Sequence, residues 1–249
     1  MVRRVADRDK RATGRIPETT AREAPARGRA GDGTCVILAS ASPRRRELLA
    51  LLGVPFRVRA ARNVDEEAYR DAPERLVGTL AVAKAREVAA DEGPEDSAGR
   101  IVLGADTVIA HRGEVLGKPR DAEHASSMLE RLSGDTHEVF TGVAVVVPDG
   151  TTLVGVAASR VMFRELAPDA IARYVASGES LGKAGAYAIQ GSGVCVVAAL
   201  HGCYYNVVGL PLRLTARLLA AAGVPCAAYR CDCSTHLLQR AAPDCAEER

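Results

Sequence analysis

The sequence predicts an α/β fold, a mixed twisted sheet with flanking helices. Strands and helices alternate through the first half of the chain, which is the pattern of a sheet covered by helices. Two β-rich runs, 138–147 and 151–164, are then joined by Pro148–Asp149–Gly150, which predicts an antiparallel hairpin within the same sheet. With 249 residues the chain is long enough for one large domain.

Each element follows from apolar patterning and from local start and stop signals. Ser42 and Pro43 are a typical N-cap and first helical residue, and Gly53 ends the helix that they begin. The expected order is a strand at 35–39, a helix at 44–52, a strand at 56–59, a helix at 73–90, a strand at 101–110, a helix at 121–132, the two hairpin strands, a helix at 168–176, a strand at 194–200 and a helix at 210–222.

The chain divides into three parts. Residues 1–34 are rich in Arg, acids and small residues without apolar periodicity, so we expect a disordered extension. This segment has no hydrophobic signal region, and its acidic residues argue against an organelle transit peptide. Residues 35–223 form the predicted domain, and 224–249 form a Cys-rich tail.

Charge and cysteine content restrict the class of protein. The net charge of +2 gives no reason to expect a nucleic-acid partner, and no apolar run is long enough to predict a membrane span. Of seven cysteines, Cys35, Cys195 and Cys203 are expected to be reduced core thiols, which favours a cytoplasmic protein. The tail cysteines 226, 231, 233 and 245, with His236, match no standard zinc spacing, and an incidental cluster is the favoured interpretation.

The first candidate site lies where the first strand meets the first helix, at Ser40–Glu47. A helix N-terminus carries free backbone N–H groups and a partial positive charge, so it attracts anions. Arg44, Arg45 and Arg46 in the first turn are unfavourable for the helix dipole by about 0.3–1 kcal/mol each. A bound polyanion would offset this misfit, whereas a solvated basic turn is the alternative.

Two further charged residues interrupt apolar patterns. Lys84 falls on the helical stripe of Leu76, Leu80 and Val88, where it either extends to solvent or faces a cleft. Asp106 stands within the apolar run 101–110, and a buried carboxylate there requires a partner. We favour a metal ligand or general base over a turn-capping Asp.

Glycine-rich segments supply the remaining candidates. Gly113–Pro119 resembles a phosphate-binding P-loop only superficially, since its glycines are one residue too close and Pro119 replaces the hydroxyl residue. The segment 178–183 fails on the same spacing. Lys118 nevertheless lies on a tight turn soon after Asp106, and Gln190 ends a run of small residues, where its amide could bind a base edge.

Together these segments resemble one family, the Maf-like nucleotide pyrophosphatases. The resemblance covers residues 35–222 in the family's motif order. It is carried by LASASPRRRELL at 38–49, GADTV at 104–108, GKP at 117–119, LSG at 132–134 with His137 and Thr141–Gly142, YVASGE at 174–179, KAGAY at 183–187, IQG at 189–191 and YYNVVGLP at 204–211.

The resemblance implies a sheet folded around a deep nucleotide-binding cleft, as in the related inosine triphosphatases, and hydrolysis of dTTP and UTP to monophosphate and pyrophosphate. It implies Asp106 as the general base and the use of a divalent metal, Mg²⁺ or Mn²⁺. We consider Asp106 and, as a second acid, Glu66 of Val64–Glu66 as the metal ligands. The phosphate-binding residues it implies are Ser40, Arg44, Arg45, Lys84 and Lys118. Arg45, Thr107 and Gln190 match the positions that choose the base.

The chain departs from the family pattern at Gly182, where an Asp is usual, and at Ala188, where a Gly is usual. The first departure removes a carboxylate near the site and bears on the rate. Two alternatives to a dTTP/UTP pyrophosphatase are a nucleotide-binding regulator of septum formation with little turnover and a 7-methyl-GTP pyrophosphatase. Among assemblies, a homodimer is considered.

Overall fold

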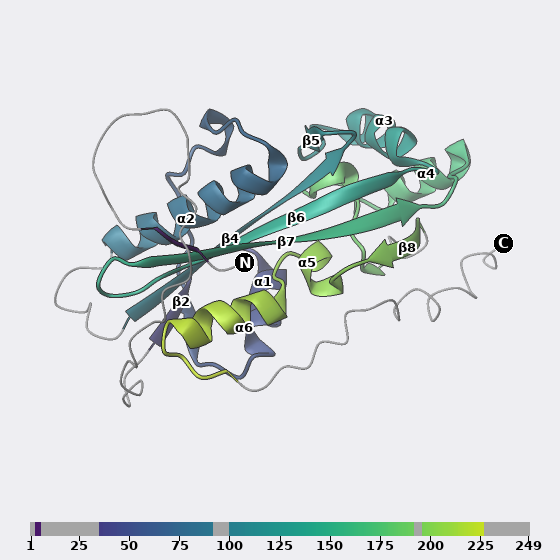
Figure 1. The fold of residues 1–249 in the computed structure, drawn as a ribbon. Coiled ribbons are helices and arrows are strands. Elements are labelled where there is room, and N and C mark those ends of the chain that lie inside the picture. Colours follow the sequence, from purple (N-terminus) through teal and green to yellow (C-terminus); the bar gives the residue numbers. More distant parts are fainter. Residues whose placement is uncertain (1–2, 6–34, 92–99, 192–195, 227–249) are drawn as a thin grey trace.

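The computed structural model describes residues 3–5, 35–91, 100–191 and 196–226. They form an eight-stranded mixed sheet whose main order is β1-β7-β6-β4-β2-β3, with β5 added to β4 and β8 added to β7 (Figure 1). The predicted class, a mixed sheet with flanking helices, is confirmed.

The strands are β1 Arg3–Val5, β2 Cys35–Leu38, β3 Phe56–Val58, β4 Arg100–His111, β5 Glu114–Leu116, β6 Thr136–Val146, β7 Thr152–Phe163 and β8 Val197–His201. The helices are α1 Pro43–Ala50, α2 Pro73–Asp91, α3 Ala122–Leu132, α4 Pro168–Ala176, α5 Tyr204–Val208 and α6 Leu212–Ala221, with short 3₁₀ turns η1 Glu66–Ala68 and η3 Ala184–Ala186. The parallel strands are β2, β3 and the first part of β4, whereas β4, β6 and β7 form a long antiparallel meander.

Alternation along the strands gives the sheet two apolar faces. Val36 and Leu38 of β2 join the larger core with α1, α3 and α6, whereas Ile37 and Ala39 pack against α2 on the other face. Figure 1 shows α2 across β4 and β6, with α1 and α6 on the opposite side of the sheet. The sheet therefore presents neighbouring residues of one strand to different helices.

Helix α2 approaches the sheet closely because two glycines lie beneath it. A Cβ at Gly104 would meet the Ala81 carbonyl oxygen at 2.3 Å, and one at Gly142 would meet the Val77 carbonyl oxygen at 2.2 Å. Only hydrogen side chains leave room for helix backbone at this distance. The close contact sets the height at which α2 holds its side chains above β4.

Several elements differ from the sequence-based expectation. The superficially P-loop-like segment forms strand β5, which pairs with the end of β4 through a turn at Arg112 and Gly113. The predicted last helix, 210–222, is confirmed as α6, but the short helix α5 before it was not predicted; Gly209 with φ of 122° ends α5, and Pro211 precedes α6. Strand β5 and helix α5 are too short for apolar periodicity to register.

The domain boundaries also shift. Within the extension expected to be disordered, Arg3–Val5 pairs with β7 as a short antiparallel strand, and the rest of residues 1–34 lies outside the described residues. At the other end Val224 is buried and Cys226 packs against the core, so the packed chain runs past residue 223.

Of the cysteines, Cys226 carries a free thiol, and Cys203 is half-buried at the start of α5. The zinc ligands considered at 231, 233, 236 and 245 lie outside the described residues, as do Cys195 and the side chain of Cys35. Across the described ranges, no helix has the length and apolar character needed to span a membrane.

Candidate functional site

The site lies along the part of β4 that extends beyond the end of its parallel neighbour β2. Strand β2 pairs with Arg100–Leu103 and stops at Leu38, whereas β4 continues to His111 and meets β5 only from Ile109 onward. Between these points the edge of β4 faces a cavity of about 500 Å³. Because the edge is open, residues from both faces of β4 reach the same cavity.

The cavity wall combines a polar end with an apolar one. Its polar and glycine lining residues are Ser40, Ser42, Arg44, Arg45, Glu66, Lys84, Asp106, Thr107, Lys118, Gly182, Lys183 and Gly209. Its apolar lining includes Ile109, Val139, Tyr187, Ala188, Ile189, Val207 and Val208. A polyanion joined to a flat, less polar group fits a cavity divided in this way.

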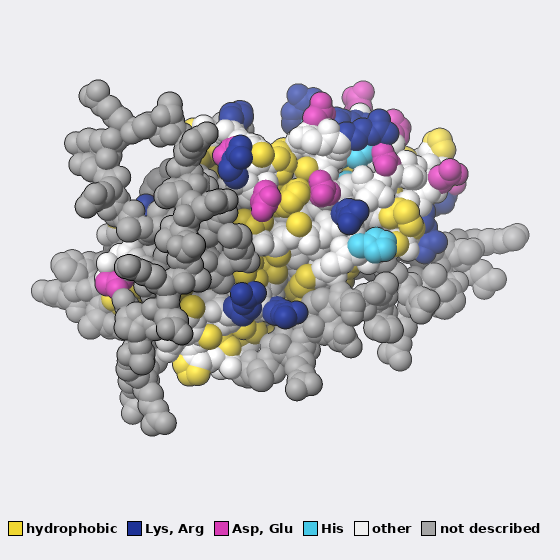
Figure 2. Space-filling view, in the orientation of Figure 1, with side chains coloured by type: hydrophobic (Ala, Val, Ile, Leu, Met, Phe, Trp, Pro, Cys, Tyr) yellow, Lys and Arg dark blue, Asp and Glu magenta, His cyan; other side chains and the backbone are white. Residues whose placement is uncertain are grey.

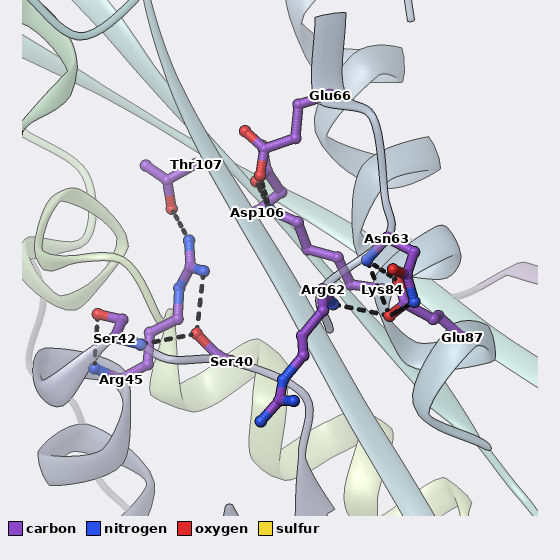
Figure 3. Close-up of polar contacts among 10 residues, drawn as sticks. All are labelled: Ser40, Ser42, Arg45, Arg62, Asn63, Glu66, Lys84, Glu87, Asp106 and Thr107. Carbon is purple, nitrogen blue, oxygen red and sulfur yellow. Dashed lines mark hydrogen bonds and ion pairs between the residues drawn. The ribbon is translucent and has the colours of Figure 1, made fainter. Parts of the chain in front are cut away.

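The polar end is organised by one lysine between two carboxylates. The Lys84 Nζ atom on α2 lies 2.6 Å from Asp106 Oδ1 and 2.6 Å from Glu66 Oε1 (Figure 3). The side chain of Asp106 is 8% exposed and that of Glu66 is 52% exposed, so the pair spans the cavity floor and its rim. Asp106 faces α2 because it alternates with Ala105 and Thr107 along β4.

The two carboxyls differ in their proton affinity. Burial raises the pKa of Asp106, and the charges of Lys84 and Arg45 offset part of that rise. Burial also acts on Glu66, but the hydrogen bond and charge of Lys84, with the charges of Lys118 and Arg45, lower its pKa overall. Asp106 is therefore the better proton acceptor, and Glu66 is the carboxyl that stays ionised.

The start of α1 supplies the second part of the polar end. Ser42 caps the helix by accepting a hydrogen bond from the Arg45 amide at 3.4 Å, and the Ser42 amide donates to Ser40 Oγ at 3.2 Å. Arg44 and Arg45 line the cavity, whereas Arg46 is exposed and does not. Two of the three arginines in the first turn thus face the cleft, as expected for an anion site.

Arg45 is held in place by neutral acceptors. Its Nε donates to the Gly209 carbonyl oxygen at 2.9 Å, and its two terminal nitrogens donate to Ser40 Oγ at 3.4 Å and Thr107 Oγ1 at 3.0 Å. Burial lowers its pKa, although a guanidinium stays protonated. A cation fixed by carbonyl and hydroxyl groups keeps its charge available for a ligand.

The hydroxyl of Thr107 has a defined proton direction. Thr141 Oγ1 donates its one proton to the Asn206 carbonyl oxygen at 3.0 Å, so the 2.9 Å contact between the two threonines must use the Thr107 proton. Thr107 also accepts from Arg45. The Thr107 hydroxyl can therefore accept a hydrogen bond from a ligand in the cavity but cannot donate one.

The apolar wall is backed by a buried ring cluster. The Tyr187 hydroxyl lies 2.7 Å from His137 Nε2, and both rings pack edge-on against Phe163. Burial lowers the pKa of His137 to about 4, so the imidazole is neutral near pH 7, and burial raises the pKa of Tyr187. This hydrogen bond fixes the tyrosine ring that forms one side of the cavity.

Comparisons with known proteins agree on one family. The family model for Maf-like proteins matches residues 35–222. The chain belongs to the Maf-like family. Relatives include the dTTP/UTP pyrophosphatases of Moorella thermoacetica, 54% identical over 76% of this chain and 95% of the relative, and of Myxococcus xanthus, 52% identical over 78% and 95%. The one from Symbiobacterium thermophilum is 49% identical over 76% of this chain and 95% of that relative.

A solved structure gives a much weaker likeness. The dITP/XTP pyrophosphatase of Mycobacterium abscessus is 17% identical, covers 53% of this chain and 76% of its own, and has a TM-score of 0.36. The two structures are therefore too different for one to inform the other.

Eight of the nine residues singled out from the sequence of this Maf-like protein line the cavity: Ser40, Arg44, Arg45, Glu66, Lys84, Asp106, Thr107 and Lys118. Gln190 is different. It is exposed and is not among the lining residues, although its neighbour Ile189 is. Its predicted role in base choice therefore finds no support in the position of its side chain here.

Lys183 is a cation of the cavity that sequence reasoning did not assign to phosphate. Its Nζ donates to the Glu179 carbonyl oxygen, and burial together with the nearby charge of Arg44 lowers its pKa. The Gly185 amide donates to the Gly117 carbonyl oxygen at 3.1 Å, which ties the loops of Lys183 and Lys118 together. The signal in the sequence that could have identified Lys183 as a site residue is its position next to Gly182, where the chain departs from the family pattern.

Gly182 itself lines the cavity. Its φ of 72° suits glycine, and a Cβ there would meet no atom within 4 Å. Asp is among the residues that tolerate this left-handed conformation. The usual Asp would thus find space at the rim, and its absence leaves Lys183 and Arg44 with less opposing charge.

The residues fit a divalent cation that binds with its substrate. Asp106 and Glu66 converge on one point, as shown by their shared 2.6 Å contacts with Lys84. Mg²⁺ is commonly bound through one or two carboxylates together with substrate phosphates. Among the described residues no group of three or more His, Cys, Asp or Glu forms a metal site by itself.

Proposed function

We propose that this Maf-like protein hydrolyses dTTP and UTP to the nucleoside monophosphate and pyrophosphate, which would keep these nucleotides from entering nucleic acids. The observation that carries the proposal is the buried Asp106 carboxylate, bonded to Lys84 in a cavity that Arg44, Arg45 and Lys118 also line. Relatives about half identical over most of the chain are named dTTP/UTP pyrophosphatases, which supports the same substrate class.

In this reaction the cations bind and orient the triphosphate. Arg44, Arg45, Lys84 and Lys118 neutralise its charge and stabilise the charge that develops as the α–β anhydride breaks. Asp106 accepts a proton from the attacking water, the water oxygen bonds to the α-phosphorus, and pyrophosphate leaves with the bridging oxygen. Glu66 and Asp106 would hold Mg²⁺ or Mn²⁺, which when bound neutralises further phosphate charge.

The products of a dTTP digest test the proposal. We expect dTMP and pyrophosphate. The described residues contain no Walker-type loop that would bind the terminal phosphate, and Asp106, the proposed general base, lies at the floor of the cleft. Ion-exchange chromatography separates the products. The appearance of dTDP and orthophosphate would contradict cleavage between the α- and β-phosphates, and stoichiometric binding without turnover would indicate a regulator.

The base preference is part of the proposal and rests on Thr107. Since its proton is directed to Thr141, its free lone pair complements the N3–H group shared by uracil and thymine. Cytosine has an acceptor at N3, so two acceptors would oppose each other. An unpaired buried polar group costs about 1–3 kcal/mol, which corresponds to a preference of roughly 5- to 150-fold.

Thr141→Val is therefore expected to reduce the ratio of kcat/KM for UTP over CTP, because the Thr107 hydroxyl becomes free to turn its proton toward the base. Gln190→Ala is the companion variant: a reduced ratio would show that the Gln190 amide contributes to base choice, and an unchanged ratio would show that it does not. Thr215→Val is the matched control, since its hydroxyl donates to the Pro211 carbonyl oxygen at 3.0 Å outside the cavity. A wild-type preference for GTP or 7-methyl-GTP would refute this assignment of the base pocket.

Two further parts of the proposal concern the setting of the enzyme. We propose a cytoplasmic location, which agrees with the free thiol of Cys226 and is measured by cell fractionation. A homodimer stays a prediction, measured by light scattering after gel filtration.

On the face shown in Figure 2, basic and acidic side chains are interspersed among apolar ones.

A further inference from the structure

The segment between β3 and η1 runs along helix α2. This segment, Arg59–Glu66, carries Glu66 at its end and contributes Ala61 to the cavity lining. Lys84, Glu87 and Asp91 on α2 are spaced by three and four residues, so they share one face of the helix. That face meets the segment at successive points.

Each of the three α2 residues contacts a different part of the segment. Asp91 Oδ2 lies 3.3 Å from an Arg59 terminal nitrogen at one end, and Lys84 Nζ lies 2.6 Å from Glu66 Oε1 at the other. Between them, Glu87 contacts residues 62–63 (Figure 3). The segment is thus attached to the helix that also supplies the lysine of the active site.

The central contact is made with backbone rather than with side chains alone. Glu87 Oε1 accepts from the Arg62 amide at 2.7 Å and from the Asn63 amide at 3.0 Å, and Oε2 accepts from the Asn63 amide at 3.1 Å. The Asn63 side-chain nitrogen adds a contact of 3.3 Å to Oε1. A carboxylate bonded to consecutive amides fixes the chain direction, which a pair of mobile side chains does not.

The ion pair between Arg59 and Asp91 constrains the segment less than the Glu87 contact does, because it joins two exposed side chains. Arg59 and Asp91 are 39% and 54% exposed, and ion pairs of that kind add little order. The Arg62 amide, followed by further backbone and side-chain hydrogen bonds, lowers the pKa of Glu87, so the carboxylate stays charged at neutral pH. Glu87 is accordingly the α2 side chain that holds the backbone in the middle of the segment, whose start is held by the Arg59 amide donating to the Leu38 carbonyl oxygen at 3.0 Å.

We propose that Glu87 is a positioning residue for the active site: it binds the Arg62–Asn63 backbone to α2 and thereby holds the Glu66 carboxylate beside Lys84 and Asp106. The inference rests on the proposed function, because Glu66 is placed there as an acid of the catalytic cleft. Glu87 lies outside the cavity lining, so its effect on substrate and metal is transmitted through Glu66.

A double-mutant cycle tests this connection. The variants are Glu87→Ala, Glu66→Gln and the two combined, in the full-length chain, with Glu74→Ala as an exposed acid near the start of the same helix. The two readouts are Mn²⁺ binding by electron paramagnetic resonance and kcat/KM for pyrophosphate release from dTTP. The Mn²⁺ measurement needs no turnover, so it decides the inference even if the proposed reaction is wrong.

Glu87→Ala is expected to weaken Mn²⁺ binding by about 10–100-fold, the usual effect of losing a residue that orients a metal ligand. In the Glu66→Gln background it should have almost no further effect, because the residue it positions is already disabled. Glu87→Gln keeps one oxygen acceptor and should recover part of the loss. Glu74→Ala should match wild type in both readouts.

Two results would overturn the inference. One is a Glu87→Ala enzyme that behaves like Glu74→Ala in both readouts. The other is a set of losses that multiply in the double variant, since Glu87 would then act independently of Glu66. If wild type releases no pyrophosphate but the Mn²⁺ cycle shows the expected non-additivity, the positioning role stands and the proposed activity does not.

Discussion

Asp106→Asn is expected to lower kcat by about 10²–10⁴-fold while dTTP still binds, because the amide preserves shape but cannot accept a proton. Its carboxylate is buried in the cavity wall and is the proposed proton acceptor, and the variant keeps the cations of α1 and of the Lys118 turn that we propose bind phosphate. Single-turnover rates and equilibrium dTTP binding separate chemistry from affinity. Asp135→Asn is the matched control, since Asp135 bonds His111 and Arg112 outside the cavity.

The same residue should set the acidic limb of the pH profile. Burial raises the pKa of Asp106, and a general base works only when deprotonated. Activity should therefore be lost, as the pH falls, at a value above the ordinary Asp pKa of about 3.9. A variant within a few-fold of wild type, with an unchanged acidic limb, would show that another group takes the proton.

Gly142→Ala is expected to destabilise the fold by about 3 kcal/mol or more, at the upper end of overpacking effects. The added Cβ would lie 2.2 Å from the Val77 carbonyl oxygen and 2.7 Å from the Gly78 amide nitrogen, and backbone atoms cannot rotate away as a side chain can. Helix α2 must move off the sheet, and Lys84 moves with it. Thermal unfolding should show a fall in Tm of roughly 6–12 °C, and turnover should fall as well.

Gly78→Ala is the matched comparison on the other side of the same contact. A Cβ there would meet only the side chains of Val156 at 3.6 Å and Val154 at 3.9 Å, which is ordinary van der Waals distance. Replacing glycine by alanine within a helix favours the folded state by about 0.5–1 kcal/mol. Equal losses in the two variants would show that close helix–sheet approach is not what Gly142 provides.

Local signals in the chain were sufficient for much of the architecture. Pro168–Ala176 forms the helix predicted there, and α1 begins at Pro43 behind the Ser42 cap. The hairpin of β6 and β7 follows from the turn at residues 148–150. These predictions succeed because caps, turns and apolar periodicity act over a few residues, within the range that one segment of sequence controls.

The sequence by itself determined which side chains are candidates for the site, because the motifs that contain Arg44, Asp106 and Lys118 can be read without knowing how the chain folds. Only the tertiary structure decided how they meet. Arg45 donates to the Gly209 carbonyl oxygen, 164 residues away, and Lys84 meets both Glu66 and Asp106. It also left Gln190 outside the cavity lining. The physical reason is that packing across the whole domain sets the length of each strand, the order of the strands and the distance of α2 from the sheet. The direction in which a side chain points is therefore decided only when the sheet is assembled.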